Sequence, residues 1–184
     1  SCAEQSAKPF TEQSLLNYQA ARECYAEQRH DEALALLLEN HESEPRFSAN
    51  SFLIGKIYYF GGEPARAEHY WRHTLAMNPH HLDTKKWLAR LLLLQDRTEE
   101  ARQLLSEALA FSSEDPELLL LLAKVKRRQQ DLAGAIELYM KSKAFAERLS
   151  EASIDLAEIY CSFGLTDRAE EELERAIALL GEGA

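Results

Sequence analysis

Residues 48–81 read SANSFLIGKIYYFGGEPARAEHYWRHTLAMNPHH. This stretch contains two apolar segments, which are separated by Gly61-Gly62 and followed by Asn78-Pro79. Apolar residues spaced three and four apart on both sides of the break predict two amphipathic helices. Pro64 follows the glycine pair, and proline is well suited to the first turn of a helix. The stretch therefore indicates a helical hairpin.

The same pattern recurs at a constant interval along the chain. Each repeat has a small residue on its second helix, at Ala33, Ala67, Ala101, Ala135 and Ala169. Four residues later a large residue follows, at Leu37, Trp71, Leu105, Tyr139 and Leu173. A constant period of this kind is typical of repeat proteins whose units stack on one another, and an ordinary bundle with accidental periodicity is the alternative.

This pattern resembles the tetratricopeptide repeat (TPR) family. Repeat two carries the residues of the family motif at Ile54, Gly55, Tyr58, Ala67, Trp71 and Pro79. The resemblance implies an all-α fold, a right-handed superhelical solenoid of five helix-turn-helix units. We expect a leader over residues 1–13 and a single domain over 14–183, with repeats at 14–47, 48–81, 82–115, 116–149 and 150–183.

The last helix is expected to close the stack by itself. A solenoid must cover the apolar side of its terminal repeat, and no further capping helix is visible in the sequence. We expect the inward-facing residues to be Ala169, Leu173, Ala176, Ile177 and Leu180.

The composition narrows the classes of function. The chain has 184 residues and a net charge of -10, which argues against nonspecific binding to nucleic acid. No apolar run approaches the ~18 residues of a membrane span. No phosphate loop, nucleophile elbow or zinc-protease motif is present, so we expect neither an enzyme nor a cofactor. His69 and His73, one helical turn apart, are weak candidates for a metal site.

The N-terminal residues suggest a location. The chain begins Ser1-Cys2-Ala3 and continues with a short polar stretch, which resembles a mature bacterial lipoprotein with an acylated Cys2. The expected location is then the bacterial cell envelope, facing the periplasm. A cytoplasmic fragment of a larger assembly is the alternative.

The concave face is the expected binding site, because TPR proteins line it with residues of the first helix of each repeat. Four cations recur in register at Arg22, Lys56, Arg90 and Lys124, against the net negative charge of the chain. The whole predicted groove comprises Tyr18, Arg22, Tyr25, Phe52, Lys56, Tyr59, Phe60, Lys86, Trp87, Arg90, Lys124, Arg127 and Arg128. Cations between aromatic rings suit a protein or peptide with acidic and apolar residues.

The sequence therefore predicts a non-catalytic scaffold that binds a partner protein, tethered to a membrane through Cys2. The alternatives are an intracellular scaffold and a carrier of a small ligand or metal. Self-association is left open.

Overall fold

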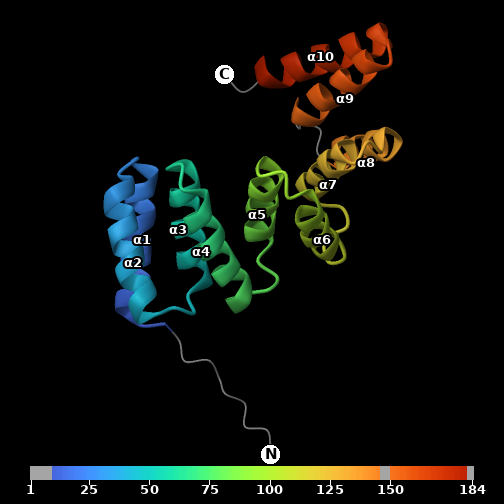
Figure 1. Ribbon diagram of the computed structural model, residues 1–184. Helices are drawn as coiled ribbons and strands as arrows, with labels where there is room; N and C mark the ends of the chain where they lie inside the picture. The colour runs from blue at the N-terminus through green and yellow to red at the C-terminus, as the bar shows by residue number, and fades with distance from the viewer. Residues whose placement is uncertain (1–9, 146–149, 182–184) are drawn as a thin grey trace, which may run out of the picture. The chain divides into compact units, whose positions relative to one another are not determined.

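The structure is a computed structural model that describes residues 10–145 and 150–181. Within these ranges the chain forms ten α-helices and no strand (Figure 1). The predicted all-α fold is confirmed. Residues 1–9 of the predicted leader, Cys2 among them, lie outside the described residues, and its last two residues, Glu12 and Gln13, belong to the first helix.

The helices alternate as first and second members of hairpins. The first helices are α1 (Glu12–Ala26), α3 (Ser48–Phe60), α5 (Leu82–Leu94), α7 (Pro116–Arg128) and α9 (Ser150–Ser162). The second helices are α2 (His30–Ser43), α4 (Pro64–Met77), α6 (Thr98–Leu109), α8 (Leu132–Phe145) and α10 (Thr166–Gly181). The second helices begin at a constant interval, which equals the spacing of the anchor alanines, so the sequence period is the period of the hairpins.

The turn inside each hairpin also keeps this period. The residue with positive φ is Gln28 (63°), Gly62 (77°), Asp96 (58°), Gln130 (63°) and Gly164 (70°), one in each repeat at the same interval. A left-handed residue after a helix lets the backbone reverse, and glycine adopts it without the Cβ penalty that other residues pay. The three hairpins without glycine therefore have strained turns.

The chain divides into two compact units between Thr84 and Lys85, in the first turn of α5. Unit 1 contains α1 to α4 and unit 2 contains the rest of α5 together with α6 to α10. The single domain over 14–183 stays a prediction.

Two buried asparagines join the hairpins of unit 1. The Asn40 amide of α2 donates hydrogen bonds to the Ser14 carbonyl (3.1 Å) and to Asn50 Oδ1 (3.0 Å). The Asn50 amide of α3 donates in turn to the Leu37 carbonyl (2.9 Å). Asn40 stands where the TPR pattern has a small apolar residue, and this network is the reason that an amide fits there.

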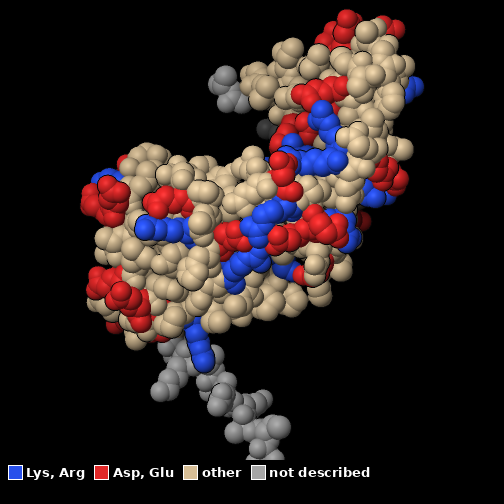
Figure 2. Space-filling view, in the orientation of Figure 1, with Lys and Arg blue, Asp and Glu red and all other residues tan. Residues whose placement is uncertain are grey.

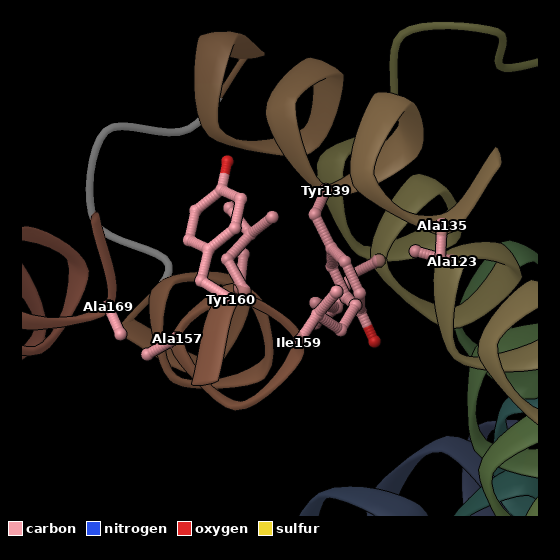
Figure 3. Close-up of a cluster of buried hydrophobic side chains, with 10 residues drawn as sticks. Ala123, Ala135, Tyr139, Ala157, Ile159, Tyr160 and Ala169 are labelled. Atoms are coloured by element: carbon pink, nitrogen blue, oxygen red, sulfur yellow. The ribbon is translucent and has the colours of Figure 1, made fainter. Parts of the chain in front are cut away.

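An apolar cluster in unit 2 joins α7, α8, α9 and α10. Figure 3 shows Tyr139 of α8 beside Ile159 of α9, with Ala123 and Ala135 to the right of Tyr139. The Tyr139 hydroxyl donates a hydrogen bond to Asp155 Oδ2 (2.8 Å), so the buried phenol is satisfied. Small residues such as Ala157 and Ala169 let the helices of the last hairpin approach closely.

We expected that α10 would turn all of its apolar residues inward and so close the stack, and this expectation is wrong in part. Ala169 and Ala176 are buried against α9, as predicted. Leu173, Ile177 and Leu180 are exposed, because they lie on the side of α10 that in the earlier repeats carries the next hairpin. Among the described residues, repeat five therefore presents an apolar surface.

Candidate interaction site

In unit 1 the predicted groove residues lie on α1 and α3. Lys56 Nζ of α3 lies 5.5 Å from the centroid of the Tyr25 ring of α1 and 6.0 Å from that of Phe52. An ammonium group at this distance is attracted to the face of an aromatic ring. We call Tyr18, Arg22, Tyr25, Phe52 and Lys56 the cation–aromatic patch.

The rings of the cation–aromatic patch are partly buried. Burial raises the pKa of Tyr18, and the positive charge of Arg22 lowers it by a smaller amount. Burial also raises the pKa of Tyr25. Both phenols are therefore neutral at physiological pH, and the charge of the patch comes from Arg22 and Lys56. The patch combines positive charge with apolar rings.

Tyr59 and Phe60 lie at the end of α3 and belong to unit 1 as well. The Tyr59 ring lies 5.6 Å from the Trp71 ring and 5.3 Å from the Phe60 ring, between centroids. Phe60 is exposed although it is a large apolar residue. An exposed phenyl ring beside a half-buried tyrosine is suited to contact with a partner.

In unit 2 the predicted cations pair with carboxylates of the following repeats. Lys86 Nζ of α5 lies 2.8 Å from Asp115 and 2.9 Å from Glu117, at the start of α7. Arg90 lies 3.9 Å from Glu117 and 4.0 Å from Glu151 of α9.

The same pairing continues from α7 to α9. Lys124 Nζ lies 2.8 Å from Glu151 and 2.9 Å from Asp155. Arg127 lies 3.7 Å from Asp155 and 2.5 Å from Glu158. We call these four cations and five carboxylates the charge ladder: Lys86, Arg90, Lys124, Arg127, Asp115, Glu117, Glu151, Asp155 and Glu158.

The charge ladder holds its lysines in the charged form. Burial alone would lower the pKa of Lys124, but hydrogen bonds to Glu151 and Asp155 outweigh it, and the pKa is raised. The pKa of Lys86 is raised against burial in the same way by Asp115 and Glu117. Figure 2 shows Lys and Arg side chains interleaved with Asp and Glu side chains on one face, not a continuous basic stripe. A partner would therefore meet paired charges in unit 2.

Two predicted residues remain. Arg128 turns back to Asp96 in the hairpin turn of the preceding repeat, at 2.5 Å. Trp87 is half-buried on α5. The sequence signal for the ladder was available, since Glu117 and Glu151 stand one repeat period apart at the start of two first helices. This spacing shows which cations the two carboxylates meet only when the stacking of the repeats is known.

The histidines form a small aromatic cluster. The rings of His41 and His73 lie 4.8 Å apart, and His73 Nε2 lies 2.6 Å from the Pro45 carbonyl oxygen, which engages one of its two nitrogens. His69 packs edge-on against Tyr70. The described residues contain no group of three or more His, Cys, Asp or Glu side chains arranged to hold a metal ion. Of the cysteines described, Cys24 is buried and Cys161 exposed.

No helix in the described part of the chain combines the length and the apolar character that a bilayer crossing needs.

The stacked hairpins define the class: an all-α helical-repeat protein. Residues 61–125 match the family model described as tetratricopeptide repeat. This match places the tetratricopeptide repeat pattern in that segment, and the fold of the whole chain is the fold of TPR proteins. The resemblance drawn from the sequence is confirmed.

Three solved structures illustrate this fold. MamA from Desulfovibrio magneticus RS-1 is 18% identical with a TM-score of 0.81, over 95% of this chain and 98% of that chain. PilW, a widely conserved type IV pilus biogenesis factor, is 18% identical with a TM-score of 0.83, over 94% and 80%. YrrB, a TPR protein with an unusual peptide-binding site, is 16% identical with a TM-score of 0.72, over 90% and 86%. No curated protein sequence matches the chain.

Proposed function

We propose that the protein is a non-catalytic scaffold that binds a partner protein or peptide through its first helices. The observation that carries this proposal is the position of Lys56 against the rings of Tyr25 and Phe52. A fixed cation between aromatic rings binds carboxylates and apolar groups of one ligand together. The likeness to YrrB, which has a peptide-binding site, supports the same kind of function.

The cation–aromatic patch is the stronger half of the proposed groove. In unit 2 an acidic ligand would have to displace carboxylates that lie 2.8 to 2.9 Å from Lys86 and Lys124. Arg22 is exposed on α1 and is directed to no carboxylate among the described residues. An acidic partner therefore gains more at Arg22 than along the charge ladder.

The proposed location is the bacterial cell envelope, with Cys2 acylated. The likeness to PilW, a pilus biogenesis factor, supports a role among envelope assemblies. Acyl chains contribute about 0.8 kcal/mol per buried CH₂, so several chains on one cysteine anchor a protein firmly. Metabolic labelling with a fatty acid tests the anchor. We expect label on the wild-type protein expressed in its host and none on Cys2→Ser, and an unlabelled wild type would refute the anchor.

The binding surface is tested by charge reversal. Arg22→Glu/Lys56→Glu is compared with Arg102→Glu/Lys141→Glu, which makes the same change in net charge on the exposed second helices α6 and α8. The readout is the set of proteins recovered with each variant from the native host, after circular dichroism has shown unchanged helix content. We expect the partner to be lost only from the first variant. Equal recovery with both would remove the patch from the proposed function.

A further inference from the structure

The exposed side of α10 carries an apolar stripe. Leu173, Ile177 and Leu180 are spaced by four and three residues, which places them on one side of the helix. Their exposed fractions are 42%, 68% and 62%. These are large values for aliphatic side chains in an amphipathic helix, and they occur side by side. We call these three residues the α10 stripe.

The repeats show what covers this position elsewhere. Leu173 corresponds to Leu37, Leu105 and Tyr139 in other repeats, and each of these is 0% exposed. The first helix of the next repeat lies over them. Asn50 of α3 bonds the Leu37 carbonyl, and Asp155 of α9 accepts from Tyr139. Among the described residues no helix takes that place over α10. The stripe is therefore shaped to receive a helix.

The charges beside the stripe determine which kind of helix can bind there. Asp167, Glu170 and Glu174 are exposed next to it, and none of them forms an ion pair with a described residue. The two arginines of α10 are engaged elsewhere: Arg168 lies 6.0 Å from the Tyr160 ring centroid, and Arg175 bonds Glu172 at 3.3 Å. The border of the stripe is acidic, so a helix that binds there should carry basic residues.

A second copy of this chain fits poorly. Two α10 helices face to face would supply no cation for these carboxylates, because both arginines of α10 are engaged elsewhere. The α1 helix of a second copy would offer Gln19 and Glu23 at the positions where α3 has Leu53 and Ile57. These polar groups would be buried without partners, at a cost in free energy.

We propose that the α10 stripe binds an amphipathic helix of a partner protein, one that carries basic residues in its C-terminal half. The helix takes the place that the first helix of a sixth repeat would occupy. In this fold, consecutive helices such as α2 and α3 are joined by four residues and run antiparallel. The C-terminal half of the bound helix therefore lies over Asp167 and Glu170, at the start of α10.

The chain contains a helix of the required kind. α7 buries Leu118, Leu121 and Val125, whose spacing of three and four residues places them on one side of the helix, and its last turn contains Lys126, Arg127 and Arg128. A synthetic peptide of residues 116–128 is the probe. Three changes keep the peptide soluble and leave only the side with Leu118, Leu121 and Val125 apolar: Leu119→Gln, Leu120→Gln and Leu122→Gln.

The experiment is a fluorescence anisotropy titration of this labelled peptide with the whole chain. We expect Ile177→Ser to weaken binding about tenfold, since an aliphatic contact is lost, and Met140→Ser, at an exposed residue of α8, to leave it unchanged. Glu170→Lys/Glu174→Lys is expected to weaken binding further and to reduce its dependence on salt. A peptide with the four cations of its last five residues replaced by Glu should not bind.

Two results would overturn the proposal. One is the absence of binding to the basic peptide, or binding that Ile177→Ser leaves unchanged. The other is self-association in sedimentation experiments that Ile177→Ser abolishes, because the occupant would then be a second copy. This surface is separate from the cation–aromatic patch, so Arg22→Glu/Lys56→Glu should bind the peptide normally, and either proposal can fail without the other.

Discussion

The indole ring of Trp71 fills the space that a side chain on Gly55 would need. A Cβ at Gly55 would overlap Trp71 Nε1 and Cδ1 and would lie 2.9 Å from Cε2. The indole N–H donates to the Phe52 carbonyl at 3.2 Å, which holds the ring in place. The other repeats have Ala at the position of Gly55 and a smaller residue at that of Trp71. Within this hairpin, the absence of a side chain at Gly55 therefore compensates for the large side chain of Trp71.

Gly55→Ala should destabilise the protein by about 1–3 kcal/mol, because the added methyl group displaces a fully buried ring. Chemical denaturation followed by circular dichroism measures this loss. Trp71→Leu restores the pair found in repeats one and three, so Gly55→Ala/Trp71→Leu should be more stable than the sum of the single changes predicts. Additive effects would mean that the two residues are not coupled.

This pairing of a small with a large residue illustrates what the sequence can predict. The constant repeat period placed large and small residues in register and so identified the hairpins, their turns and the fold class. It could not show that Asn40 and Asn50 pair, or that the cations of α5 and α7 meet Glu117, Glu151 and Asp155. Those contacts join residues of different hairpins, whose distance depends on how the hairpins stack.

The exposed α10 stripe was missed for a related reason. A helical pattern shows which residues share one side of a helix, and Leu173, Ile177 and Leu180 do share one. It does not show whether a neighbouring helix covers that side. At the position of Leu173, the same pattern describes a buried side chain in repeats one to four and an exposed one in repeat five.

The strained turns offer a stabilising change. Gln130 adopts a φ of 63°, a conformation that Gly164 adopts in the next hairpin with φ 70°. Gln130→Gly should raise the free energy of unfolding by about 0.5–1 kcal/mol, since the Cβ penalty of the left-handed conformation is removed. Gly164→Ala should lower it by about 1 kcal/mol at the equivalent turn. Thermal unfolding of both variants checks the pair, and a change of the same sign in both would contradict the explanation.

Among the carboxylates of the charge ladder, we expect Asp155 to contribute most to the free energy of unfolding. Its side chain is 12% exposed, accepts from Tyr139 and lies 2.9 Å from Lys124 Nζ. Asp155→Ala should cost about 2–3 kcal/mol, because it leaves a buried hydroxyl without its acceptor and Lys124 with Glu151 alone. Glu158→Ala removes a ladder carboxylate that is mostly exposed, and it should cost less than about 0.5 kcal/mol. Equal losses in denaturation experiments would show that burial does not decide the contribution.

Acid should weaken unit 1 through two histidines. Burial lowers the pKa of His41, with smaller contributions from the charges of His73 and His69, while Glu42 acts in the opposite direction. Burial also lowers the pKa of His81, against the charge of Asp83. The folded state therefore holds both imidazoles neutral at pH values where the unfolded chain binds protons.

The sign of the effect follows from this difference. Stability is full above the ordinary histidine pKa of about 6.5 and falls as the pH decreases below it, until the folded-state pKa is passed. Denaturation at pH 7.5 and 5.5 should give a lower free energy of unfolding at pH 5.5. His41→Gln should reduce that difference, because it removes one of the two half-buried imidazoles, whereas His80→Gln changes an exposed residue and should not. A pH difference that His41→Gln leaves intact would assign the effect to His81 or to carboxylates elsewhere in the chain.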